Sequence, residues 1–101
     1  MNVVENQVRE LVAVELAAAN ERFPQFHSAH EGYAVIKEEI EETAEEIAHC
    51  NVLLDDLWDS IRDNISFRSV GDIKESAIQA AVEAIQVAAM AQKFLEMDGK
   101  K

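Results

Sequence analysis

Six glutamates lie within nine residues of this chain, at positions 38–46, and carboxylates at this density can bind a divalent cation. A solvent-exposed helix also carries such runs of glutamate. The position of each glutamate around the helix axis therefore decides whether it faces solvent or could bind a cation. At about 100° per residue, three point away from the apolar side: Glu38, Glu41 and Glu45. The other three belong to a row that is otherwise apolar, here named the acidic row: Val35, Glu39, Glu42, Glu46, Cys50, Leu53 and Leu57. Burying three carboxylates without counter-charge costs several kcal/mol each, so this row predicts a bound cation.

A further acid lies on the most apolar segment of the chain. Glu83 is the only acid between Ala77 and Leu95, and Gln86 follows it by one helical turn. A carboxylate facing the acidic row from another helix would complete a set of oxygen ligands for a divalent cation. The alternative is an ion pair between Glu83 and a basic side chain, for which the candidates are Arg62, Lys74 and Lys93. The sequence leaves both interpretations open.

Three helices are predicted to position these groups, over residues 2–20, 29–64 and 72–97, with a polar connection over 64–71. Ser28 and Glu31 have the S-x-x-E spacing of a capping box, which marks the start of the second helix. The third is apolar nearly all round, which predicts the buried centre of a bundle. In the connection between the first two helices, Phe23 and Phe26 are expected to pack on the bundle and hold this connection in place. The expected fold class is all-α, a helical bundle in a single domain over residues 1–101.

Composition and charge exclude several classes of protein. The formal net charge is −11 and the isoelectric point about 4.5, so the surface repels nucleic acid and anionic membranes. An acidic protein that handles phosphates needs metal ions as a bridge. The single cysteine, Cys50, excludes an internal disulfide and fits a reducing compartment. No stretch approaches about 18 apolar residues, and the N-terminus lacks an apolar leader, so the cytoplasm is the expected location.

The second helix is long for its chain and apolar on two sides. Its roughly 35 residues extend about 50 Å at 1.5 Å per residue. A second set of residues, here named the apolar stripe, lies beside the acidic row and extends from Tyr33 to Ile61. Its first members are Tyr33, Ile36, Ile40, Ala44 and Ile47. The first and third helices of one chain can cover only one of these sides fully. A homodimer or homotetramer is therefore expected, with the second helix in the interface and the acidic row close to it.

Three segments resemble the MazG-like nucleoside triphosphate pyrophosphohydrolases, in particular the small members carried by phages and prophages. Residues 38–42, Glu-Glu-Ile-Glu-Glu, match the family pattern EExxE, and the segments 28–36 and 83–91 look like the phage members. The resemblance covers roughly residues 20–97. It implies an all-α fold and a nucleotide-pool housecleaning enzyme. The implied reaction is Mg²⁺-dependent cleavage of an NTP or dNTP substrate between its α- and β-phosphates.

Carried onto this chain, the resemblance assigns roles to particular residues. Glu39, Glu42 and Glu83 would bind Mg²⁺, with Mn²⁺ as a possible substitute. Glu38 would be a further ligand or the base that activates the attacking water. The second family motif is ExxD, whereas this chain has Gln86 in the last position, which offers a carbonyl oxygen but one negative charge fewer. The gap between the two motifs is also longer than in the family. Basic side chains would steady the phosphates, and the candidates are Arg62, Arg68 and Lys74.

Gln86 also supports a rival from a different class, a non-catalytic interaction protein that retains the MazG-like fold. One version binds a metal ion but has lost turnover. Another version uses the net charge of −11 as a phage-encoded decoy for a DNA-binding protein of the host. Pyrophosphate release from NTPs and dNTPs would separate the enzyme from both versions of the rival.

Overall fold

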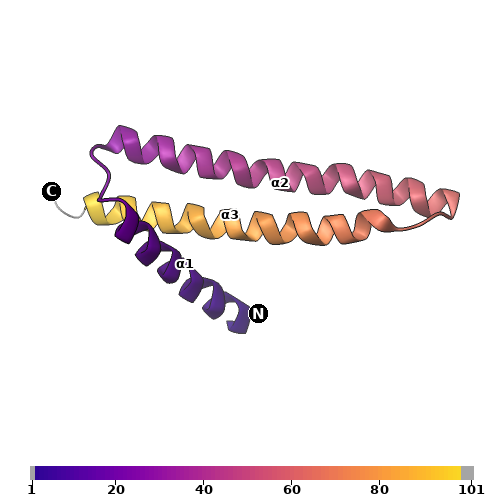
Figure 1. Cartoon of the computed structure of the whole chain (residues 1–101), viewed down its shortest axis with the longest axis horizontal. Helices are drawn as coiled ribbons and strands as arrows, with labels where there is room; N and C mark the ends of the chain where they lie inside the picture. The colour runs from indigo at the N-terminus through magenta and orange to yellow at the C-terminus, as the bar shows by residue number, and fades with distance from the viewer. Residues whose placement is uncertain (1, 99–101) are drawn as a thin grey trace.

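In the computed structural model, which describes residues 2–98, the chain consists of three α-helices, and this range contains no strand. The helices are α1 (Asn2–Arg22), α2 (Ala29–Asp63) and α3 (Arg68–Asp98). α2 and α3 form a long antiparallel hairpin, and α1 diverges at an angle from its open end, where α2 begins and α3 ends (Figure 1). The predicted all-α bundle is confirmed. No helix within the described range is both long and apolar enough to cross a membrane.

A side-chain cap and a left-handed residue set the bounds of α2. At its start, Ser28 Oγ accepts a hydrogen bond from Glu31 N (3.1 Å), as the S-x-x-E spacing predicts. Glu31 Oε1 in turn accepts from His27 N (2.6 Å), one residue before the cap. At the other end, Asn64 adopts φ 55° and ψ 47°, and Ile65 N donates to Ser60 O (3.0 Å). α2 therefore ends through the conformation of an asparagine, without a glycine or a proline.

The connection between α2 and α3 is shorter than the sequence indicates. The polar residues and Gly71 predict a connection over 64–71, whereas α3 begins at Arg68 and includes Gly71. A glycine inside a helix costs only about 1 kcal/mol relative to alanine, and Ser69 in the first turn is buried. Packing of this turn therefore outweighs the helix-weakening effect of Gly71. α1 likewise continues to Arg22, beyond the predicted end at residue 20.

The side of α2 that packs on α3 is the acidic row. Leu53 is buried there and Glu42 is exposed, while the five other members are half-buried: Val35, Glu39, Glu46, Cys50 and Leu57. The apolar stripe faces outward instead, with large exposed side chains at Tyr33, Ile40, Ile47, Leu54, Trp58 and Ile61. One chain therefore covers one apolar side of α2 and leaves the other open, as the length and pattern of this helix predict.

α3 lies between the other two helices, since it packs on both, while α1 and α2 do not pack on each other within the described residues. Its predicted central place is confirmed. The prediction that it is buried nearly all round is wrong for a single chain, because Ile78 and Val82 are 44% and 41% exposed. α1 runs away from α3 toward its own N-terminus, so it covers only part of α3 (Figure 1).

Only one of the two aromatic residues in the first connection packs on the bundle. Phe26 is half-buried, and its ring centroid lies 6.4 Å from that of Phe94. Gln25 Nε2 donates to Lys93 O (2.8 Å) and so ties the connection to α3. Phe23 is 62% exposed, so the prediction that it pins the connection is wrong. Gln25 and Phe26 already occupy the contact with α3.

We expect Gly32, in the first turn of α2, not to tolerate a side chain. A Cβ atom at this position would lie 2.5 Å from Phe94 Cδ2 and 3.0 Å from Phe26 Cδ2. Gly32→Ala should therefore lower the free energy of unfolding by about 1–3 kcal/mol, as overpacking of a filled contact does. Urea denaturation followed by circular dichroism measures this difference.

Gly71→Ala is the matched control, because a Cβ there has no neighbour within 4 Å. It should raise the free energy of unfolding by up to about 1 kcal/mol, since alanine favours the helical state over glycine. Stabilisation by both variants would show that the contact of Gly32 with Phe94 does not constrain the fold.

Candidate metal centre

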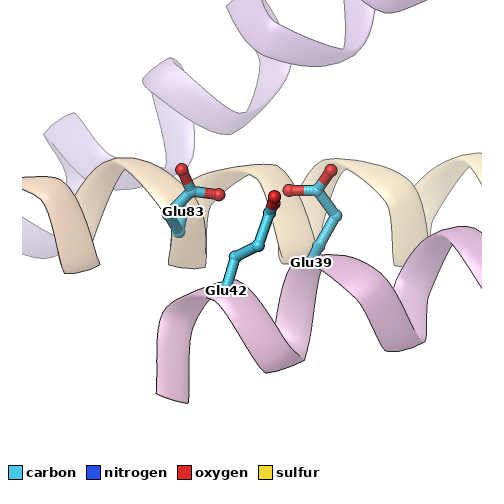
Figure 2. Close-up of side chains that lie close together, drawn as sticks. All are labelled: Glu39, Glu42 and Glu83. Atoms are coloured by element: carbon cyan, nitrogen blue, oxygen red, sulfur yellow. The ribbon is translucent and has the colours of Figure 1, made fainter. Parts of the chain in front are cut away.

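Packing of α2 on α3 brings three carboxylates together. Glu39 and Glu42 lie one turn apart on α2, and Glu83 extends toward them from α3 (Figure 2). One carboxylate oxygen from each of the three lies within 4.8 Å of the others. Two oxygen ligands on opposite sides of a Mg²⁺ ion, each at about 2.1 Å, are about 4.2 Å apart. Small side-chain movements therefore suffice for the three carboxylates to bind one divalent cation.

The three carboxylates repel one another and lack a basic partner. Burial first, and then the charges of Glu42 and Glu83, raises the pKa of Glu39 to about 7. Among the side chains that the structure describes, no Lys, Arg or His nitrogen lies within 4.0 Å of a carboxylate of this cluster. The alternative ion pair of Glu83 is thus not formed with any of its candidates: Arg62, Lys74 and Lys93. A divalent cation would provide the positive charge that the neighbouring side chains do not.

Gln86 lies against the cluster and contacts it through its side-chain amide. In the orientation that satisfies its hydrogen bonds, Nε2 donates to Glu39 Oε2 (2.9 Å) and to Glu83 Oε2 (3.1 Å). The amide thereby holds two of the carboxylates in place and partly offsets their repulsion. To act as a metal ligand, which is its predicted role, the amide would have to rotate so that Oε1 faces the ion.

The other residues assigned to the site lie outside the cluster. Glu38 is exposed next to Glu39, and its charge is among the causes of the raised pKa of Glu39. Arg62 lies more than five helical turns, about 30 Å, beyond Glu42 along α2, where it pairs with Asp59 (3.2 Å). Lys74 is exposed, and its backbone lies about 13 Å before that of Glu83 along α3. Within one chain, the fold does not bring Arg62 or Lys74 to the carboxylates.

A cavity of about 650 Å³ lies beside the cluster, between α1, the first connection and the α2–α3 hairpin. Glu39 and Gln86 line one part of it and Phe26 and Lys93 another, while α1 contributes residues that include Arg22. Its volume is within the range of small-molecule sites, about 300–1,000 Å³. Sequence patterns do not reveal this cavity, because its walls come from all three helices. The one feature of the sequence that could have pointed to it is Lys93, the only basic residue between Ala77 and Leu95 in an otherwise apolar segment.

Comparison of the chain with models of protein families, with curated proteins and with solved structures found no match. The resemblance noted in the sequence therefore stays a hypothesis, and the interpretation depends on the geometry of the site. That geometry combines an oxygen-rich ligand set, of the kind that hard cations prefer, with an adjacent cavity large enough for an organic molecule.

The raised pKa of Glu39 predicts a pH dependence of stability in the metal-free protein. Its pKa rises from an ordinary value of 4.5 to about 7 on folding, so the folded state binds the proton more tightly than the unfolded state. The contribution of this group is therefore most favourable below pH 4.5 and is lost as the pH rises to about 7.

Glu39→Gln removes this titration. In urea denaturation with EDTA present, the wild type should lose stability relative to Glu39→Gln as the pH rises from about 4.5 to about 7. Other acids titrate in both proteins, so the difference between them isolates Glu39. A difference that stays constant across this pH range would contradict the raised pKa.

Proposed function

We propose that this protein is a Mg²⁺-dependent nucleoside triphosphate pyrophosphohydrolase, which converts an NTP or dNTP into the monophosphate and pyrophosphate. The observation that carries the proposal is the convergence of Glu39, Glu42 and Glu83 from two helices, with no basic partner among the described side chains and with Glu39 lining a cavity. The MazG-like motifs supply the reaction class. As part of the same proposal, the enzyme acts on the nucleotide pool of the cytoplasm, and its origin is a phage or prophage.

In this proposal the ligands come from both helices of the hairpin. Glu39, Glu42 and Glu83 would hold the ion, which supplies the positive charge needed to bind and polarise phosphate oxygens next to an acidic protein. Gln86 keeps Glu39 and Glu83 in position through its two hydrogen bonds. The MazG-like motif suggests Glu38 as the base; it is exposed beside Glu39 and would have to turn toward the ion to take a proton from water. The water oxygen bonds to the α-phosphorus, the bond from that phosphorus to the bridging oxygen breaks, and pyrophosphate leaves.

One observation favours a rival function. Gln86 places a neutral amide against the carboxylates, where a fourth carboxylate would bind a hard cation more strongly. A protein that binds the ion without turnover would fit this arrangement as well. The two functions differ in pyrophosphate release and agree on metal binding, so both properties have to be measured.

We expect Mg²⁺ and Mn²⁺ to bind in titration calorimetry, and pyrophosphate to be released from at least one common NTP or dNTP. Glu39→Gln and Glu42→Gln should each weaken ion binding at least about tenfold, because each removes one charged ligand of the three. Both variants should also abolish pyrophosphate release.

Glu45→Gln is the matched control for these variants. It changes the charge of the same helix by the same amount, at an exposed position that points away from α3. Loss of binding in this variant too would point to general electrostatics. Ion binding without pyrophosphate release would favour the non-catalytic rival. Absence of ion binding would reject both the enzyme and the protein that binds the ion without turnover.

We further propose that the enzyme is a homo-oligomer, at least a dimer, formed through the apolar stripe of α2. A folded monomer of 11.3 kDa is expected to expose about 5,700 Å², whereas this chain exposes 7497 Å². The excess of about 1,800 Å² matches the area that one partner buries in an obligate homodimer. Exposed apolar side chains on this stripe supply the surface, among them Ile40, Ile47 and Trp58.

Light scattering should give a particle of at least twice the 11.3 kDa chain mass at micromolar concentration. Ile47→Glu should shift the mass toward the single chain, because it puts a charge into the apolar stripe. Ala48→Glu adds the same charge at the next residue, which is exposed and lies off the stripe, and should leave the mass unchanged. A wild-type monomer would reject this part of the proposal.

A further inference from the structure

Lys93 is a buried cation that forms no ion pair with any side chain that the structure describes. Only 3% of its surface is exposed, and among the side chains that the structure describes no carboxylate oxygen lies within 4.0 Å of Nζ. Nζ lies instead over the ring of Phe26, 5.1 Å from its centroid. The neighbouring Glu31 attracts Lys93 only from a distance, because its carboxylate accepts a hydrogen bond from His27 N (2.6 Å) and lies 3.4 Å from His27 Nδ1. A buried ammonium that no carboxylate contacts is unfavourable, so this position suits an anionic ligand.

Lys93 lines the same cavity as Glu39 of the carboxylate cluster, so one ligand can contact both. Along α3 it lies two helical turns, about 10 Å, beyond Gln86, whose amide contacts the cluster. Arg22 lines the cavity from α1 and adds a second cation. Away from the cluster, the acids in the lining are Glu15 and Glu31. The cavity thus reaches the carboxylate cluster at Glu39 in one part and holds a buried cation in another.

We infer that Lys93 binds a phosphate group of an organic phosphate held in this cavity. The sequence motifs do not include this residue, and the inference rests on the proposed function for the identification of the ligand as a nucleotide. Gln86, next to the carboxylate cluster, and Lys93 are about 10 Å apart along α3. A triphosphate chain that begins near the cluster, together with the length of the lysine side chain, can span this distance. Lys93 is then the group that recognises the charge of the ligand, while Phe26 beneath it holds the ammonium in place.

The test measures binding rather than turnover. The probes are the α,β-methylene analogues of the common deoxynucleoside triphosphates with Mg²⁺, the matching monophosphates, and the matching nucleosides. Lys93→Met should weaken binding of the phosphorylated probes at least tenfold and leave binding of the nucleosides unchanged. Lys93→Arg should retain most of the affinity, because it keeps the charge. Arg9→Met removes the same charge at an exposed position of α1 outside the cavity lining; it is the control and should behave as the wild type.

Thermal unfolding separates a binding role from a structural one. Without ligand, Lys93→Met should unfold at the same temperature as the wild type or higher, because methionine keeps the apolar stem and removes an unpaired buried charge. The increase in unfolding temperature that a phosphorylated probe causes in the wild type should be lost. A lower unfolding temperature with unchanged probe affinity would show that Lys93 is structural.

The inference and the proposed function can fail separately. Lys93-dependent binding without pyrophosphate release would reject the reaction and leave the inference standing. Equal affinities of the wild type and Lys93→Met for every phosphorylated probe, with release intact, would reject the inference alone. It is also rejected if no phosphorylated probe binds the wild type more tightly than its nucleoside does.

Discussion

The contact between α2 and α3 governs this protein, because it places carboxylates in an interface that is otherwise apolar. Glu39 lies on the same row of α2 as the buried Leu53, and Glu83 meets it from α3. Burial of Glu39 and its repulsion by the neighbouring carboxylates oppose this packing, and together, burial first, they raise its pKa. A proton, the amide of Gln86 or a bound cation can each reduce the repulsion. The occupancy of the cluster and the stability of the hairpin are therefore linked.

The shape of the chain sets a second constraint. The hairpin is long and thin, with overall extents of 60 × 30 × 21 Å, and its buried apolar residues among those described are Leu53, Ala80 and Ala89. So small an interior gives a lone chain little hydrophobic stabilisation. A partner on the apolar stripe would add the missing cover without disturbing the acidic row, because the two sets lie on different sides of α2. One helix can thus serve the site and the assembly at once.

α1 has a different role, because it forms a wall of the cavity rather than much of the core. Gln25 and Phe26 fix the start of the connection against α3, and α1 departs from that point at an angle (Figure 1). The close contact at Gly32 brings the first turn of α2 against Phe94 in the same region. These contacts also surround Lys93, so the packing that shapes this part of the cavity is what buries the cation there.

The sequence by itself determined what depends on neighbouring residues: three helices, the start of α2 at Ser28, and the outward direction of Glu38. The proximity of Glu39 to Glu42 also follows from the spacing of one helix. The start of α3 at Arg68 and the exposure of Phe23 depended on tertiary contacts that outweigh local propensity. Both sides of α2 had an apolar pattern, so only the packing of α3 decided which side it covers and whether Glu83 meets the acidic row. The cavity around Lys93 was likewise decided by the tertiary structure, because its walls join segments that lie far apart in the chain.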